Sequence, residues 1–207
     1  GSEEVGVFRH TPHGGALDEP LWNKDLTSLE VASYFTHYSS YTVDSALSGL
    51  ATDRAVNPES LLCLSCHDGS LSINAVHNVS NTHSDPEYKT GGVDPYMEIV
   101  IQAGVDKRIG DGGGDLSDDH PISFSYSTVL SDPIYSGGSR DGELRSIAQA
   151  STWAGEGVRF FGTNNRVECS TCHDPHVYYD LWGNEAYAPF LIMPNTNSNL
   201  CFACHNK

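Results

Sequence analysis

The sequence predicts a mostly irregular fold with a few short helices and one small β-hairpin, and two observations predict it. Hydrophobic residues make up 38% of the 207 residues, against about 45–50% in globular proteins by a count that includes glycine. The chain also holds 20 glycines and 10 prolines, with Ser, Asn, Asp and Thr abundant between them. Loops of this composition need something besides hydrophobic burial to fix them.

Few regular elements are expected in the first half of the chain. Residues 1–60 are polar and irregular apart from one short helix near Leu26–Phe35. Residues 94–104 are expected to form a second short helix, which ends at Gly104. The glycine- and aspartate-rich stretch Gly110–Asp119 is expected to be a solvated loop, because its spacing is not that of a calcium-binding EF-hand.

The second half carries stronger signals for a helix and a hairpin. Leu144, Ile147 and Ala148 would share one face of a helix over Asp141–Thr152. Two strands, Val158–Phe161 and Arg166–Ser170, are separated by the turn sequence Gly-Thr-Asn-Asn. This pattern predicts a β-hairpin.

The charge of the chain is strongly negative, with 27 acidic and 11 basic residues and a formal net charge of -16. Nucleic acid and anionic membranes would be repelled and are not expected as partners. No window approaches 18 consecutive apolar residues, so no membrane span is expected. The charge indicates either a surface that resists nonspecific association or attraction to cationic partners.

The six cysteines all fall in C-x-x-C pairs, and a histidine follows each pair at once. The three motifs are Cys63-Leu64-Ser65-Cys66-His67, Cys169-Ser170-Thr171-Cys172-His173 and Cys201-Phe202-Ala203-Cys204-His205. This spacing is typical of covalent haem c attachment. The two thiols of each motif would form thioethers with the porphyrin, and the imidazole that follows would be the proximal iron ligand. The sequence therefore predicts three covalent haems.

Three other uses of C-x-x-C pairs explain the pattern less well. A four-cysteine zinc site would leave the third pair unused. A thioredoxin-like motif needs one pair in a βαβ setting, and a disulfide framework needs cysteines spread along the chain. With 10 histidines in the chain, a histidine after all three pairs by chance has a probability of about one in ten thousand.

The remaining histidines offer a second axial ligand for each iron. Only Met97 and Met193 could supply sulfur instead, so bis-histidine ligation is expected for all three haems. His176 lies three residues beyond a proximal histidine, an offset that aims it towards a neighbouring haem. His120 precedes a proline that restricts its backbone, and His13 stands in Thr-Pro-His-Gly-Gly. The sequence around His37, His77 and His83 gives no such indication, and surface or hydrogen-bonded roles are expected for these three.

Four segments of the chain resemble the extracellular multihaem cytochromes of metal-respiring microbes, especially the OmcE-like tetrahaem group that polymerises into conductive filaments. The matching segments are residues 62–69, 119–124, 167–174 and 199–205. The resemblance implies one multihaem domain over residues 1–207, with an N-terminal segment over 1–60 and a three-haem region over 61–207. It also implies head-to-tail self-association of subunits.

The N-terminus departs from that family. The family commonly opens with C-x-x-C-H-T-P-H, whereas this chain has Gly6 and Arg9 where the cysteines would be, followed by His10-Thr11-Pro12-His13. The resemblance implies a first site that lost its thiols and its haem, with His13 still serving a neighbouring haem. A coincidence over eight residues is the alternative. If the first site was lost, His10 has no iron of its own and would be either idle or a ligand across a subunit contact.

The expected distal ligands are therefore His13, His120 and His176. The working assignment pairs them in that order with the haems on Cys63/Cys66, Cys169/Cys172 and Cys201/Cys204. The predicted function is electron transfer rather than enzymatic catalysis, because the spare histidines make an open iron position unnecessary. A discrete periplasmic or cell-surface carrier, and a multihaem oxyanion reductase, are the alternatives to a filament subunit.

The expected location follows from the haem motifs, and the expected self-association follows from the resemblance. Haem c is attached outside the bacterial inner membrane, so the protein is expected to be extracellular or on the cell surface, with the periplasm as the alternative. The sequence begins Gly-Ser-Glu-Glu, and a secreted protein whose signal peptide has been removed is expected. Expected partners are further copies of the chain, other redox proteins and extracellular metal oxides.

Overall fold

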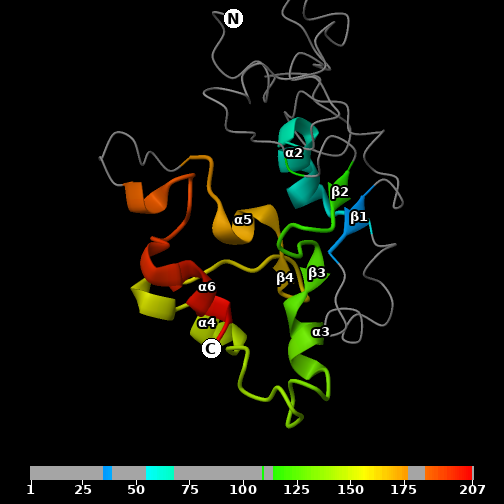
Figure 1. Ribbon diagram of the computed structural model, residues 1–207, viewed down its shortest axis with the longest axis vertical. Helices are drawn as coiled ribbons and strands as arrows, with labels where there is room; N and C mark the ends of the chain where they lie inside the picture. The colour runs from blue at the N-terminus through cyan, green and yellow to red at the C-terminus, as the bar shows by residue number, and fades with distance from the viewer. Residues whose placement is uncertain (1–34, 39–54, 68–108, 110–113, 177–184, 207) are drawn as a thin grey trace, which may run out of the picture. The chain divides into compact units, whose positions relative to one another are not determined.

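The computed structural model describes residues 35–38, 55–67, 109, 114–176 and 185–206 (Figure 1). Over these residues the helices are short, the two sheets have two strands each, and irregular backbone dominates. This confirms the predicted fold class of mostly coil with a few short helices. The chain divides into two compact units. Unit 1 comprises Gly1–Tyr38 and Thr52–His120, and unit 2 comprises Ser39–Ala51 and Pro121–Lys207.

Unit 1 contains a parallel pair of two-residue strands. Strand β1 (Thr36–His37) pairs with β2 (Asp115–Leu116), with Thr36 opposite Asp115 and His37 opposite Leu116. Side chains alternate across a strand, and accordingly Phe35 and His37 are each 1% exposed whereas Thr36 is exposed. The stretch Gly110–Asp119, predicted to be a solvated loop, therefore contains the two-residue strand β2. Its Leu116 side chain is buried.

The longest described helix, α2 (Pro58–His67), carries the first C-x-x-C-H motif in unit 1. Pro58 is favourable at the first position, because the first N–H groups of a helix have no intrahelical acceptor and proline has no N–H. Glu59 places a negative charge in the first turn, where it interacts favourably with the helix dipole. The buried residues fall on one face at helical spacing, and they are Ser60, Leu61, Leu64 and Ser65. The helix is thereby fixed to its unit along this face, which includes Leu64 and Ser65 between the two cysteines of the motif.

Unit 2 contains an antiparallel sheet that leads directly into a helix. Strand β3 (Phe124–Ser125) pairs with β4 (Arg166–Val167). Helix α3 (Tyr126–Ser131) follows at once, and Ser125 caps it by accepting a 3.1 Å hydrogen bond at Oγ from the Thr128 N–H. Helix α5 (Cys169–Cys172) follows β4 after one residue. The sheet therefore fixes where the second motif begins.

The main core of unit 2 lies between α4 (Ile147–Ala150) and α6 (Asn199–Cys204), which pack against each other (Figure 1). The buried members of this core are Ala150, Val158, Met193 and Ala203. Short 3-10 turns complete the unit: η2 (Trp153–Gly155), η4 (Glu185–Tyr187) and η5 (Thr196–Ser198). Because α6 carries the third motif, that motif rests directly on the core.

The predicted helix over Asp141–Thr152 is much shorter in the structure. Helix α4 spans only Ile147–Ala150, capped by Ser146, whose Oγ accepts from the Gln149 N–H at 3.3 Å. Leu144 does not join the helix because its backbone pairs with His205. Helical periodicity in the sequence was therefore overridden by a long-range backbone contact.

The predicted hairpin is reduced to one pair of residues. Phe161 and Arg166 exchange backbone hydrogen bonds of 3.0 and 2.7 Å. The strand partner of β4 is β3, not Val158–Phe161. The prediction that the second strand continues to Ser170 is wrong, because α5 begins at Cys169. The helices expected at 26–35 and 94–104 lie outside the described residues, except Phe35, which is not helical. None of the helices in the described part of the chain is long and apolar enough to cross a membrane.

A glycine forms the turn that returns the chain to α4. Gly157 has φ +71°, and a Cβ placed there would overlap the backbone of Ser151. The next residue, Val158, donates its N–H to the Ala150 carbonyl at 3.0 Å and enters the core. Glycine is therefore required here both by its backbone conformation and by close approach.

Gly142 provides a matched comparison, because its φ is +76° but nothing lies within 4 Å of the position that a Cβ would take there. We expect Gly142→Ala to destabilise the protein by about 1 kcal/mol, the cost of the left-handed conformation alone. Gly157→Ala should cost at least about twice as much, because the backbone clash adds to that conformational cost. Thermal unfolding of the two purified variants measures the difference, and equal losses would contradict this account.

Candidate haem-attachment motifs

The second and third motifs adopt the same local structure in unit 2. In each, the two cysteines are three residues apart in a helical turn, α5 or α6, so their side chains share a face. The histidine that follows has an extended backbone, with φ −115° and ψ 144° at His173 and φ −93° and ψ 132° at His205. Each histidine N–H donates to the carbonyl of the first cysteine, at 3.0 and 2.9 Å respectively.

A backbone bridge holds each of these histidines in place. His173 pairs antiparallel with Leu191, and His205 pairs antiparallel with Leu144. In both cases the residue after the leucine donates its N–H to the carbonyl of the second cysteine. The residue after the histidine donates its N–H to the carbonyl of the residue before the leucine. We call residues 190–192 and 143–145 the bridge segments of the second and third motifs.

The second motif shows how the imidazole is oriented. Nδ1 of His173 lies 3.0 Å from the Pro189 carbonyl oxygen. A carbonyl can only accept, so this contact places the proton on Nδ1 and leaves the Nε2 lone pair available. Metal-bound histidines are commonly fixed in this way through their other ring nitrogen. The arrangement therefore suits Nε2 ligation of an iron.

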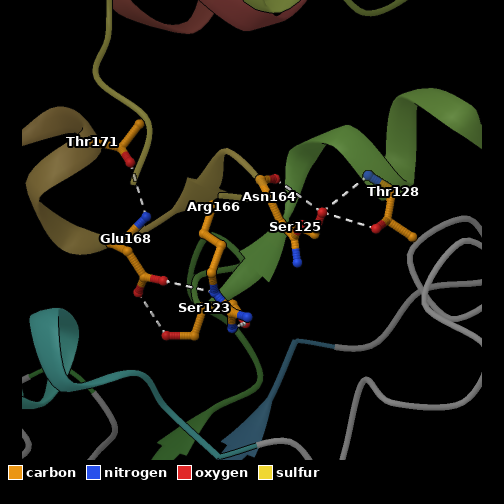
Figure 2. Close-up of polar contacts among 7 residues, drawn as sticks. All are labelled: Ser123, Ser125, Thr128, Asn164, Arg166, Glu168 and Thr171. Atoms are coloured by element: carbon orange, nitrogen blue, oxygen red, sulfur yellow. Dashed lines mark hydrogen bonds and ion pairs between the residues drawn. The ribbon is translucent and has the colours of Figure 1, made fainter. Parts of the chain in front are cut away.

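A buried polar cluster supports the start of the second motif (Figure 2). The Glu168 carboxylate, fully buried, accepts hydrogen bonds from Ser123 Oγ at 2.8 Å and from Arg166 Nε at 3.3 Å. Arg166 also donates from Nη2 to the Ser123 carbonyl at 2.6 Å. The Glu168 N–H donates to Thr171 Oγ1 at 2.9 Å, which ties the cluster to α5. A buried charge needs such partners, and removing one partner typically costs about 3–5 kcal/mol.

Three side chains hold the third motif instead. Arg145, in the bridge segment, donates from Nε to the Phe202 carbonyl at 2.7 Å, and its guanidinium lies 3.9 Å from the centroid of the Trp153 ring. Trp153 Nε1 donates to the Asn199 carbonyl at 3.1 Å. The Tyr126 hydroxyl donates to the Arg145 carbonyl at 2.8 Å, and burial raises the pKa of this phenol. Arg145 thereby satisfies a carbonyl in the last turn of α6, where helix geometry leaves carbonyls without an intrahelical donor.

Burial controls the chemistry of the thiols in unit 2. Desolvation, followed by repulsion from Cys204 and Cys201, raises the pKa of Cys172 to about 12. Desolvation likewise raises the pKa of Cys204 to about 11. Both thiols are protonated at neutral pH, the opposite of the depressed pKa that activates cysteines in thiol–disulfide enzymes. The five cysteines whose side chains the structure describes are all free of disulfides.

Exposed apolar side chains occur beside all three motifs. Three large hydrophobic residues are exposed in the described part of the chain, namely Ile109 (37%), Phe190 (43%) and Phe202 (36%). Ile109 donates its N–H to the His67 carbonyl at 2.6 Å, and the Phe190 carbonyl accepts from the residue after His173. Phe202 lies inside the third motif. Backbone hydrogen bonds therefore join Ile109 to the first motif and Phe190 to the second, and Phe202 is part of the third.

The proximal histidines and two predicted distal ligands lie within the described residues. His67, His173, His205, His120 and His176 are all exposed. His176 is held by Asp174, whose Oδ1 accepts from the His176 N–H at 2.9 Å and lies 3.3 Å from its Nδ1. The pKa of Asp174 is lowered chiefly by that backbone hydrogen bond. His13 and His10 lie outside the described residues, as does the degenerate motif at Gly6–His13.

His37 and Met193, both considered from the sequence, are buried in the structure. His37, for which a surface or hydrogen-bonded role was expected, is 1% exposed on β1 in the unit that carries the first motif. Its alternation with Phe35 was the available signal. Met193 is 0% exposed and packs in the apolar core of unit 2. The two bridge segments had no sequence signal, because they form through contacts with residues distant in the chain.

The described residues contain no group of three or more His, Cys, Asp or Glu side chains arranged as metal ligands. A haem iron requires no such group, because the porphyrin occupies four positions and protein side chains at most two. Comparison with known proteins finds no family model that matches the chain and no curated protein that matches it.

Proposed function

We propose that the chain binds three haem c groups covalently and transfers electrons through them. The observation that supports this best is the recurrence of one backbone arrangement around the second and third motifs. In both, two thiols share a helical face and the following imidazole is held by a backbone bridge. Neither a zinc site nor a disulfide needs the residue after the second cysteine to be fixed. Haem c attachment does, because that residue is the proximal ligand.

The residues of the motifs fit the group they would hold. Cys63, Cys66, Cys169, Cys172, Cys201 and Cys204 supply the thioethers, and His67, His173 and His205 supply the proximal nitrogens. The carbonyl of Pro189 leaves Nε2 of His173 free to bind. The exposed side chains of Ile109, Phe190 and Phe202 would lose contact with water against a porphyrin. When bound, each haem supplies a one-electron Fe(III)/Fe(II) couple.

The histidines outside the motifs would complete each iron. We propose His13, His120 and His176 as distal ligands, with His10 as a further candidate across a subunit contact. Asp174 fixes the backbone of His176 while its side chain stays 84% exposed, so the imidazole is available beyond its own motif. Bis-histidine ligation leaves no position for a substrate and favours electron transfer over catalysis. A reduced redox protein would supply one electron, and a second redox protein or an extracellular metal oxide would accept it.

The resemblance to filament-forming cytochromes leads to a further proposal about assembly. Each chain would be the repeating subunit of an extracellular filament, built by a head-to-tail contact that does not close. The net charge of -16 opposes self-association at long range. The subunit contact would therefore need strong local interactions, such as a histidine donated to iron across it.

The covalent haem proposal predicts the mass and colour of each motif variant. Native protein denatured in acid should remain coloured and exceed the 22.4 kDa of the polypeptide by the mass of three haems. Replacing Cys169 and Cys172 together by alanine should remove one haem, because no thioether can then form. Replacing Ser170 by alanine keeps both thiols and the buried Thr171 hydroxyl, and serves as the control. Colourless native protein of polypeptide mass would refute the proposal.

The proposed distal ligands can be tested by the spin state of the irons in histidine variants. Substituting His13, His120 or His176 by alanine should each convert one of the three irons from low spin to high spin, because a ligand position opens. His77→Ala and His83→Ala are the matched controls and should leave every iron low spin. Electron paramagnetic resonance of the oxidised proteins measures the outcome. A variant that stays fully low spin removes that histidine from the ligand set.

Assembly is tested separately by negative-stain electron microscopy of native material. Long, uniform threads are expected, and they should shorten or disappear if His10→Ala breaks a ligand across the subunit contact. Isolated particles at high protein concentration would favour the discrete carrier instead.

A further inference from the structure

The shared arrangement of the second and third motifs allows their residues to be matched position by position. The residue before the first cysteine is Glu168 in the second motif and Leu200 in the third. The residue after the histidine is Asp174 in the second motif and Asn206 in the third. At both positions a carboxylate in the second motif is replaced by a neutral side chain in the third.

The bridge segments also differ in charge, and the segment of the third motif carries a cationic side chain where that of the second carries a neutral one. Ile192 donates its backbone N–H to the Cys172 carbonyl, and Arg145 makes the equivalent bond to Cys204. The Arg145 side chain then returns to the attachment turn, where Nε meets the Phe202 carbonyl at 2.7 Å. Its other close contact is the neutral face of an indole ring. A guanidinium thus lies against the third motif where the second has an aliphatic side chain.

The two arginines that pair with the carboxylates of the second motif are more exposed than those carboxylates. Arg166 pairs with Glu168 at 3.3 Å and Arg159 pairs with Asp174 at 3.0 Å. The carboxylates are the more buried partners, at 0% and 20% exposed, against 30% and 56% for the two arginine side chains. Exposed charges are screened by water more than buried ones. The second motif therefore keeps a negative bias.

The third motif has one acidic residue in its bridge segment. Glu143 occupies the position matched by Phe190, and its carboxylate is paired with Arg140 at 3.1 Å. Within the part of the chain that the structure describes, the Arg145 guanidinium contacts a carbonyl and an aromatic ring, and no carboxylate pairs with it. By the same comparison, the Glu143–Arg140 pair is biased towards its carboxylate, which is 27% exposed against 40% for the arginine. The positive bias of the third motif therefore comes from Arg145, whose guanidinium lies at the attachment turn itself.

We propose that Arg145 and Glu168 set different reduction potentials at the two sites of unit 2, with the higher potential at Cys201/Cys204. This inference rests on the proposed function. Reduction adds one electron to the iron, so a nearby cation stabilises the reduced form and a buried carboxylate stabilises the oxidised form. A single electron entering unit 2 resides at the third motif, which gives transfer within the unit a preferred direction.

The test is a potentiometric titration of the three-haem protein and its variants, followed by absorbance with redox mediators. Arg145→Gln should lower the potential of one step by about 59 mV, a tenfold change in its one-electron equilibrium. Glu168→Gln keeps an acceptor for Ser123 and should raise the potential of a different, lower step. Arg145→Lys keeps the charge and should restore most of the Arg145 effect.

Matched controls remove the same charges elsewhere in unit 2. Arg159→Gln should not change the potential of the step that Arg145→Gln lowers. Glu156 is exposed and accepts a hydrogen bond from the Tyr187 hydroxyl. Glu156→Gln should change the potential of neither step. The inference is overturned if Arg145→Gln moves the lower step, or if Arg145→Lys shifts the potential as far as Arg145→Gln. Protein without covalent haem would give no titration steps at all, which would contradict the proposed function rather than the ordering of the sites.

Discussion

The backbone pairing of residues 172–174 and 204–206 with their bridge segments is the constraint on which unit 2 depends. A C-x-x-C turn is only four residues long and could not hold its own shape in water. The bridges at His173 and His205 supply the missing hydrogen bonds and fix the direction in which each imidazole leaves its turn. The rest of the unit can be understood as support for these two contacts.

That support takes a different chemical form at each motif. At the second, a buried carboxylate, an arginine and a serine form a closed set of hydrogen bonds between β3, β4 and α5. At the third, helix α6 packs on an apolar core, and two of its carbonyls accept hydrogen bonds from the side chains of Arg145 and Trp153. Similar backbone geometry is thus obtained from polar and from apolar surroundings, so the geometry does not depend on one kind of neighbour.

The sequence predicted the class of fold and the motifs but not the contacts that position them. Cysteine spacing is local and can be read directly, and low hydrophobicity with many glycines correctly indicated irregular backbone. Leu144 was assigned to a helix because its spacing from Ile147 and Ala148 is helical. Its actual partner is His205, far along the chain, and no local pattern encodes such a partner. Ser123 and Glu168 were missed for the same reason, since their contact joins residues distant in sequence.

The two bridges differ greatly in the length of chain they close. Leu144 and His205 are separated by more than three times as many residues as His173 and Leu191. Closing the longer loop costs about 1 kcal/mol more in chain entropy. The third motif must recover this from the α4–α6 core, so its local opening is coupled to loss of that core. The bridge of the second motif closes a shorter loop, but the start of that motif is held by the Ser123–Glu168 contact and the β3–β4 sheet, so its opening is coupled to that cluster instead of the α4–α6 core.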